Sequence, residues 1–365
     1  MAVLGTRALN RALLARQLLL APADVMPVQL VEHLVGLQAQ HPTAPYLGIW
    51  SRIPGVTTGA ISALIADRSL VRIAAMRSTV HLFSTADARW IRPVVQAAVA
   101  KGLTPGSGYG RMLTGLDREE VAAVAASYLQ EPRSTAALGE HLCAVFPERD
   151  RDALMILARC LLPLVQVPPK GLWGMSGGTV LTTLQAFVGP DPADDRGPGD
   201  LVRRYLAAFG PATVRDVQHW SGLTRLGPVV AGIRDELVAF TGEDGRELFD
   251  LPDAPRPDPA VPPPVRLLAE WDNILLGHAD RSRILPPEYK DRVFSQNGIV
   301  RGAVLVDGMV AGAWKLRTGG PRATVELQPF TRFRKADLRA AEQLAADALR
   351  FGAPEAAHEI SVLEP

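Results

Sequence analysis

The sequence predicts an α+β protein, mostly helical, in which three tandem winged-helix motifs precede a small β-barrel-like domain. Three times within the first 251 residues, helical patterns are followed by a run typical of β-strands. A proline-rich segment then separates this part from a C-terminal part in which short strand patterns alternate with turn signals. The expected divisions are 1–85, 86–190 and 198–251 for the three motifs, 252–264 for the linker and 265–365 for the C-terminal domain.

The first motif begins with three predicted helices, over 6–20, 27–40 and 57–67. Pro27 suits a first helical turn, and Thr57 or Thr58 can cap the third helix. The run that follows, 69–83, is predicted to be a strand. Three helices followed by β-structure are typical of a winged helix.

The second and third motifs repeat this order. Helices are predicted over 87–101, 117–130, 134–145 and 150–162, and strands over 164–167 and 180–187 on either side of a glycine-rich tip, 170–178. In the third motif, helices are predicted over 200–209, 213–220 and 226–234, before a hairpin that turns at Gly242-Glu-Asp-Gly245.

The C-terminal part is richer in β-structure. Strands are predicted over 266–276, 300–306, 309–317 and 323–328, which suggests a small barrel-like sheet. A helix over 335–351 follows.

The charge is unevenly distributed along the 365 residues. The net charge is +1, but residues 1–92 contain nine arginines and four acidic residues, a local charge of +5. The N-terminal quarter is therefore the part expected to face a polyanion. The excess of Arg over Lys suits bidentate contacts to phosphates and guanines, although a GC-rich genome produces the same bias.

The remaining composition favours an intracellular protein. Cys143 and Cys160 lie in apolar helical patterns without metal-type spacing, and we expect reduced, buried thiols. The first 20 residues carry arginines throughout an apolar run and are predicted to form an amphipathic helix, not a signal peptide. No stretch is long and apolar enough for a membrane span, so we expect a cytoplasmic protein without a membrane partner.

Two glutamines, Gln38 and Gln40, lie at the end of the second predicted helix and are candidate site residues. Val31, Leu34, Val35 and Gln38 share one helical face, and Pro42 forces the chain to turn. The turn can bring the Gln38 and Gln40 amides to the rim of one pocket. Two amides can hold one water or one base edge by hydrogen bonds. The alternative is that both only satisfy backbone groups freed at a helix end.

Four stretches together resemble one family, the winged-helix DNA glycosylases of the AlkZ and YcaQ type. They occur in the family's order over nearly the whole chain, as Gly36-Leu-Gln-Ala-Gln40, Met76-Arg-Ser-Thr-Val-His-Leu82, Trp271-Asp-Asn-Ile-Leu-Leu-Gly-His-Ala-Asp-Arg-Ser-Arg-Ile284 and Val304-Leu-Val-Asp-Gly-Met-Val-Ala-Gly-Ala-Trp314. The family's catalytic motif, Gln, an aliphatic residue and then Gln or Asp, falls on Gln38, Ala39 and Gln40. The second Gln matches the AlkZ-like branch, which is associated with self-resistance to DNA-alkylating natural products.

The resemblance implies a monofunctional enzyme that wraps three winged helices around double-stranded DNA. It would hydrolyse the N-glycosidic bond of bulky N7-alkylated purines and unhook interstrand crosslinks, as a monomer and without a metal or other cofactor. An N7-alkylated purine is cationic and leaves readily, so the site need only hold the flipped nucleotide and a water beneath C1′. The alternative is a non-catalytic winged-helix DNA-binding protein, either a regulator or a factor that sequesters adducts. Regulators usually bind as symmetric dimers, and three unlike motifs in one chain argue against that.

Further DNA-binding candidates follow from the same stretches. Arg72 lies in the predicted strand, and Arg77, Thr79 and His81 alternate along one of its faces, where they can contact phosphates or form a solvated wing. Asp272, Asn273, His278, Asp280, Arg281 and Arg283 form a polar group that we interpret as mostly structural ion pairing, with Arg281 and Arg283 gripping the DNA backbone. Asp272 and His278 lack a third metal ligand at suitable spacing.

Overall fold

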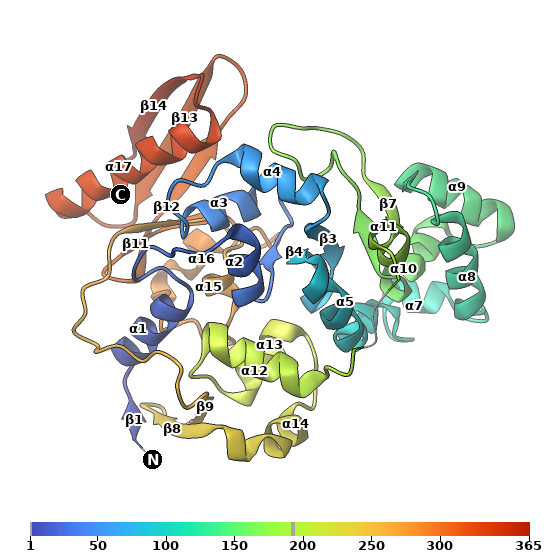
Figure 1. The fold of residues 1–365 in the computed structure, drawn as a ribbon, viewed down its shortest axis with the longest axis horizontal. Coiled ribbons are helices and arrows are strands. Elements are labelled where there is room, and N and C mark those ends of the chain that lie inside the picture. The colour runs from blue at the N-terminus through green and yellow to red at the C-terminus, as the bar shows by residue number, and fades with distance from the viewer. Residues whose placement is uncertain (1, 191–193) are drawn as a thin grey trace.

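The computed structural model describes residues 2–190 and 194–365. It is an α+β structure, mostly helical, as predicted. The N-terminal helices lie at the centre, a lobe of helices α7 to α10 projects on one side, and the C-terminal sheet lies on another (Figure 1).

The N-terminal unit departs from the prediction at its second helix. Its helices are α1 (Thr6–Arg16), α2 (Pro27–His33), α3 (Ala44–Trp50) and α4 (Thr58–Ala66). The helix predicted over 27–40 is wrong beyond His33, because Val35 and Gly36 adopt left-handed conformations (φ 56° and 83°) and turn the chain before Pro42 is reached. A short strand, β2 (Leu37–Gln38), and the unpredicted helix α3 follow.

The run predicted as one strand over 69–83 is a hairpin. Arg77 and Ser78 both have positive φ angles, 53° and 59°, and the chain reverses there. The predicted alternation of Arg77, Thr79 and His81 along one strand face is therefore wrong. The hairpin consists of β3 (Leu70–Ala74), the 3-10 turn η1 (Met76–Ser78) and β4 (Val80–Ser84).

The helices of the second lobe agree with the prediction where capping residues mark their starts. Asp117, Ser134 and Asp150 cap α8, α9 and α10 through their side chains. The strand predicted over 180–187 ends at Thr183, whose side chain caps a short helix instead. The elements are α5 (Thr85–Val94), α6 (Gln96–Val99), η2 (Ala100–Leu103), α7 (Gly108–Met112), α8 (Arg118–Tyr128), β5 (Arg133–Ser134), α9 (Thr135–Val145), α10 (Arg151–Leu161), β6 (Leu164–Gln166), β7 (Val180–Thr183) and α11 (Leu184–Val188).

One six-stranded sheet, in the order β2-β4-β3-β6-β7-β5, joins the first two hairpins. Ile73 of β3 lies opposite Val165 of β6. The boundary expected near residue 85 therefore separates two stretches of chain that contribute strands to the same sheet. Strand β3, which leads into the turn that carries Arg77, pairs with β4 on one side and with β6 on the other.

The third unit contains the hairpin predicted at Gly242 to Gly245. Its elements are α12 (Pro198–Phe209), α13 (Val214–Ser221), α14 (Gly227–Gly232), η3 (Arg234–Glu236), β8 (Val238–Gly242) and β9 (Glu247–Asp250), with β1 (Val3–Leu4) parallel to β8. Arg16 Nη1 of α1 and Asp250 Oδ1 lie 2.6 Å apart, fully buried, so the third unit is attached directly to the first helix.

The C-terminal sheet is open, and the predicted barrel-like closure is wrong. In the described chain its five strands run in the order β10-β11-β12-β13-β14, and β14, which was not predicted, pairs in parallel with β13. The predicted 266–276 strand is short because Asp272 caps a helix inside it. The elements are β10 (Arg266–Leu268), α15 (Asn273–Leu276), η4 (Pro287–Tyr289), α16 (Lys290–Val293), β11 (Gly302–Val306), β12 (Met309–Arg317), β13 (Arg322–Pro329), α17 (Lys335–Gly352) and β14 (Ala357–Val362).

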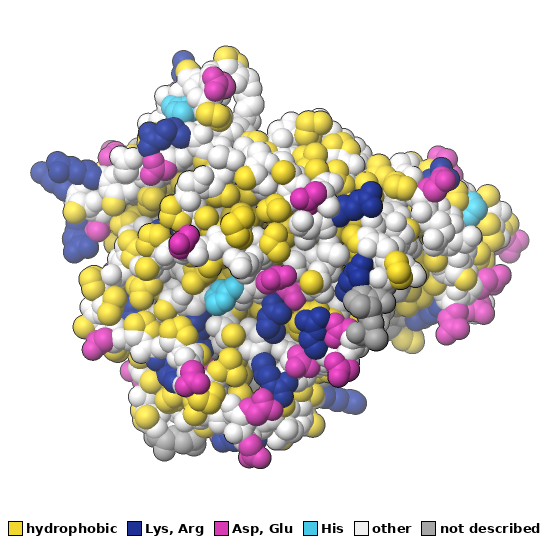
Figure 2. Space-filling view, viewed as in Figure 1, with side chains coloured by type: hydrophobic (Ala, Val, Ile, Leu, Met, Phe, Trp, Pro, Cys, Tyr) yellow, Lys and Arg dark blue, Asp and Glu magenta, His cyan; other side chains and the backbone are white. Residues whose placement is uncertain are grey.

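Most of the N-terminal arginines hold the fold together, which corrects the expectation that this quarter forms a polyanion-binding face. Five of them are at most 3% exposed: Arg11, Arg16, Arg52, Arg72 and Arg92. Three of the N-terminal arginines hold the linker 252–264 in place, because its carbonyl groups accept hydrogen bonds from Arg7, Arg11 and Arg16. On the face shown in Figure 2, basic and acidic side chains lie side by side. Arg204 of α12 is paired with Asp87 of α5 at 2.7 Å.

None of the helices in the described residues is long and apolar enough to cross a membrane. Cys143 and Cys160 are free thiols, as predicted, but only Cys160 is buried; the prediction of burial is wrong for Cys143, which is partly exposed.

A buried ion pair links the N-terminal unit to the C-terminal part. Arg52 donates to both carboxylate oxygens of Asp272, at 2.9 and 2.8 Å, and both side chains are at most 1% exposed. Arg52 also donates to the backbone oxygens of Gln17 and Gly48, so its charge and its donors are satisfied inside the protein.

Arg52→Met should therefore be strongly destabilising, by about 3–5 kcal/mol, because it leaves the Asp272 carboxylate buried without its counter-charge. Urea unfolding of the purified variant measures this loss. Arg322→Met is the matched control, since Arg322 pairs with Glu359 on the exposed surface and its loss should leave the unfolding midpoint almost unchanged. Equal midpoints for Arg52→Met and the parent protein would contradict the role of this pair.

Candidate active site

Gln38 lies in a strand, not on a helix face. It is opposite His81 in the β2–β4 pairing and is 7% exposed. Its Oε1 accepts a hydrogen bond from Arg77 Nη2 at 2.6 Å. The amide oxygen is thereby fixed, and the orientation of the Nε2 group is fixed with it.

The position of β2 depends on the left-handed turn before it. A Cβ atom on Gly36 would lie 2.4 Å from the Phe83 ring, so only glycine fits there. Asn273 Nδ2 donates to the carbonyl oxygens of Leu34 (3.2 Å) and Gly36 (2.6 Å). Asn273 follows Asp272 directly, so the ion pair with Arg52 and the support of the glutamine strand belong to one short segment.

Gln40 meets the same hairpin. Its side chain is exposed, and its Oε1 accepts from the Val80 N–H at 3.3 Å. Between the two glutamines, the Ala39 N–H donates to the Val80 oxygen at 2.7 Å and extends the pairing with β4. Both amides thus lie against the β4 hairpin, through strand pairing and not through a helix end; that they share the rim of one pocket stays a prediction.

Arg77 connects this edge to the third unit. Besides holding Gln38, its guanidinium donates to the backbone oxygen of Trp220 near the end of α13. Burial, and secondarily the positive charge of Arg281, lower the pKa of Arg77 to about 10, so the guanidinium stays protonated at neutral pH. Sequence reasoning predicted Arg77 as a DNA contact and missed its contact with Gln38, because the two residues are 39 positions apart.

His81 is buried beside Gln38 and is uncharged. It is 2% exposed, stacks on Phe83, and its Nδ1 lies 2.9 Å from the Thr79 oxygen. Burial, and then the charge of Arg77, lower its pKa to about 3. Because Nδ1 donates to a carbonyl group, Nε2 carries the free lone pair. Thr79 itself closes the turn, with its hydroxyl donating to the Met76 oxygen at 3.0 Å.

Two of the other predicted DNA contacts are buried, which corrects the expectation of direct backbone contacts. Arg72 is 3% exposed, donates to the Ala39 oxygen and contacts Gln166. Arg283 is 7% exposed and donates to the Pro211 oxygen at 2.8 Å. Neither guanidinium is presented to a phosphate. Arg281 is partly exposed and lies beside His219, with 3.2 Å between Nη2 and Nε2.

A basic groove begins at Arg77. A cavity of about 780 Å³ lies between the η1 turn, the segment after α6, and α13, and a second of about 320 Å³ adjoins it, with Arg215 and Ala279 lining both. We define the basic groove by the cationic and imidazole side chains that line the two cavities: Arg77, Lys101, Arg215, His219, Arg246, Arg281 and Lys290. Asp280 is the acidic side chain among its lining residues and is paired with Arg246 at 2.8 Å.

Most groove residues were missed from sequence. Lys101, Arg215, Arg246 and Lys290 come from four separate segments, and three of them stand beside acidic residues in the sequence. The packing of α13 against η1 and the ion pair between Arg246 and Asp280 help to bring these segments together, so tertiary contacts and not local spacing assemble the set.

Asp272 and His278 of the 271–284 segment are held by protein partners, whereas Asp280 lines the basic groove. Asp272 is bound to Arg52, and buried His278 lies with Nε2 3.1 Å from the Phe209 oxygen. Within residues 2–190 and 194–365, no group of three or more His, Cys, Asp or Glu side chains is arranged to hold a metal ion.

Comparison with known proteins identifies the family of this chain. A sequence model of the family described as AlkZ-like DNA glycosylases matches residues 31–351, and the chain therefore belongs to this DNA glycosylase family. A curated relative, the interstrand DNA cross-link repair glycosylase of Streptomyces sahachiroi, is 27% identical over 312 residues, which cover 78% of this chain and 81% of the relative. The solved structure of the S. sahachiroi DNA glycosylase AlkZ aligns over the full length of both chains with a TM-score of 0.81 and 21% identity, which establishes the shared fold.

The state of His81 predicts a pH-dependent stability. Its folded-state pKa of about 3 lies below the ordinary value of about 6.5, so between these values the unfolded chain binds more protons than the folded protein. The free energy of unfolding should therefore fall as the pH falls from 7 to 5, by about 2 kcal/mol for this histidine. Buried His278, whose pKa is also lowered to about 3, acts in the same direction.

Urea unfolding of the parent protein and of His81→Gln at pH 7 and pH 5 measures the effect. The variant should lose roughly half of the pH dependence, because one of the two buried histidines is removed. Identical pH dependence in both proteins would mean that His81 is protonated freely in the folded state.

Proposed function

We propose that this glycosylase hydrolyses the N-glycosidic bond of bulky N7-alkylated purines and, like the named relative, unhooks interstrand crosslinks. The observation that carries the proposal is the Gln38 amide, held by Arg77 at 2.6 Å at the start of the basic groove. Gln40, two residues further along the same segment, accepts from Val80 of the same partner strand. Arg77 lines the groove and holds Gln38, so we infer that a nucleotide extruded from a backbone bound in the groove reaches the two glutamines.

The hydrogen bonds of the two amides suggest a separate role for each in orienting the attacking water. Gln38 Oε1 is engaged by Arg77, so Nε2 is the group left to donate to one lone pair of the attacking water. Gln40 Oε1 accepts from Val80 and has a second lone pair that can accept a proton of the same water. The water is oriented beneath C1′ without being strongly deprotonated, which suffices for a cationic leaving group.

The basic groove supports the binding of the DNA backbone. Arg215, Lys101 and Arg281 are candidates for phosphate contacts, in place of the buried Arg72 and Arg283. We propose that the three helix–hairpin units act as winged helices on one duplex, with the chain working as a monomer. His81 lies opposite Gln38 and Thr79 closes the η1 turn, so both support the site without contacting DNA.

Gln40→Ala should slow base release by about 10²-fold or more, because the acceptor for the water is removed. Single-turnover release from duplexes carrying an N7-alkylguanine monoadduct or an N7–N7 crosslink measures the rate. The exposed position of Gln40 means that thermal stability and DNA affinity should be nearly unchanged.

Gln38→Ala should also be slow, and thermal melting separates catalysis from folding because Gln38 is buried. Gln40→Asp should retain activity on monoadducts, since a carboxylate can accept the same hydrogen bond and stabilise the cationic sugar. Full-speed release by a folded Gln38→Ala, Gln40→Ala double variant would remove the glutamines from the mechanism.

Arg77 is proposed to position Gln38, and a double-mutant cycle tests this. If Arg77 acts through the amide, Arg77→Met should slow single-turnover release at saturating protein on the order of 10-fold in the parent, and should have no further effect in Gln38→Ala. DNA affinity should change little.

Arg215→Met is the matched control, because it lines the groove without contacting Gln38 among the described residues. It should lower DNA affinity, and its effect should add to that of Gln38→Ala. Additive effects for Arg77→Met and Gln38→Ala would instead assign Arg77 to the DNA backbone.

A further inference from the structure

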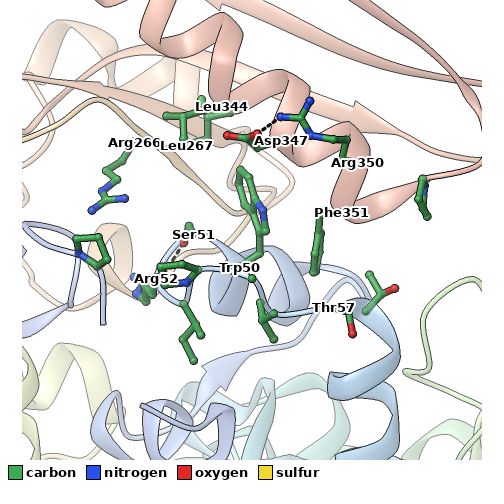
Figure 3. Close-up of a pocket in the computed structure, with 17 residues that line it drawn as sticks. Trp50, Ser51, Arg52, Thr57, Arg266, Leu267, Leu344, Asp347, Arg350 and Phe351 are labelled. Atoms are coloured by element: carbon green, nitrogen blue, oxygen red, sulfur yellow. Dashed lines mark hydrogen bonds and ion pairs between the residues drawn. The ribbon is translucent and has the colours of Figure 1, made fainter. Parts of the chain in front are cut away.

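A separate cavity lies away from the glutamines, at the seam between the N-terminal unit and the C-terminal module. It has a volume of about 580 Å³ and is lined by the end of α3, the segment 51–58, β10 and α17. Figure 3 shows it between α17 and the segment that follows α3. It shares no lining residue with the basic groove. Its volume is typical of small-molecule sites.

The walls of this seam cavity are mainly apolar. Trp50 and Phe351 contact each other with ring centroids 6.0 Å apart and planes at 31°, and both rings line the cavity together with Leu267 and Leu344. Trp50 is only partly buried, and Phe351 is 9% exposed. Such surfaces favour a flat, apolar ligand body.

One positive charge in the cavity has no counter-charge. Arg266 donates through Nε to the Leu19 oxygen at 2.8 Å, and within the described residues no protein acceptor is found for its two Nη groups. Burial, and secondarily the like charge of Arg52, lower the pKa of Arg266. An arginine in this state is stabilised by an anion that accepts from both Nη atoms.

The other charges that line the cavity are neutralised by neighbours. Arg52 is bound by Asp272 through both carboxylate oxygens. Arg350 is paired with Asp347 at the rim. The cavity therefore has a net charge of one positive unit, and the carboxylate of Asp347 disfavours a ligand with two negative charges.

We propose that the seam cavity binds a small aromatic monocarboxylate. The aromatic body packs against Trp50 and Phe351, and the carboxylate accepts two hydrogen bonds from the Nη groups of Arg266. The site is distinct from the DNA path and independent of the roles assigned to Gln38 and Gln40.

Isothermal titration of the full-length protein with 2-naphthoate tests the site. Saturable binding with a Kd below about 1 mM is expected, which is the affinity reached by a ligand of this size with ordinary efficiency. The neutral analogue 2-naphthylmethanol should bind at least 10-fold more weakly, because it lacks the charge that pairs with Arg266.

Two variants locate the binding. Arg266→Gln should weaken 2-naphthoate at least 10-fold, and Leu344→Trp, which fills the cavity while leaving Arg266 in place, should abolish binding. Arg322→Gln, an exposed arginine outside the cavity, is the matched control and should bind like the parent. Thermal melting verifies that each variant is folded.

The proposal is overturned by any of three results: no saturable heat with the parent protein, equal affinity for the acid and the alcohol, or parental affinity in both folded variants. The charge and the space are removed separately, so loss of binding in Leu344→Trp alone overturns the role of Arg266. Loss of binding in Arg266→Gln alone overturns the placement of the aromatic body in the cavity.

Discussion

The site depends on one buried junction between distant parts of the chain. Arg52 and Asp272 neutralise each other away from water, and the next residue, Asn273, holds the carbonyl groups of Leu34 and Gly36. The glutamine strand has only two residues and lacks the pairing to hold itself in place. Its geometry is therefore set by a C-terminal segment that takes no part in the chemistry. A shift of this segment would separate Asp272 from Arg52 and leave buried charges unpaired, which is costly. The ion pair therefore also fixes the position of the segment.

The two titratable side chains that contact Gln38 or lie opposite it in the strand pairing bear on the selectivity of the proposed mechanism. An unmodified purine leaves the sugar readily only if the base is protonated, whereas an N7-alkylated purine already carries the charge. Glu270 and Asp272 line a small cavity together with Gln38. The titratable side chains that contact Gln38 or lie opposite it are Arg77, which is a cation at neutral pH, and His81, which is neutral because burial lowers its pKa to about 3. Neither protonates a normal base at neutral pH. In the mechanism proposed above, the alkylated base itself supplies the leaving group.

Local signals identified much of the architecture. Capping residues marked α4 and α8 to α10, turn residues marked the third hairpin, and the ordered motifs indicated the family and the glutamine pair. What failed was set by long-range packing. Gly36 marked the true helix end, but Pro42 was taken as the stop. The bend at Arg77 has no glycine to reveal it, and the open edge of the C-terminal sheet depends on β14. A count of arginines cannot tell that five of them are buried partners of carbonyl and carboxylate groups.

The contact between Arg77 and Gln38 has a consequence for how such an activity can arise. The glutamine pair is not a portable motif, because its geometry requires an arginine from a left-handed turn, a carbonyl group at the end of α13 and an asparagine more than two hundred residues away. Introducing Gln-Ala-Gln into another winged helix would transfer the three residues without the groups that orient them. The same dependence means that a search for this short motif alone would collect many proteins that cannot perform the reaction.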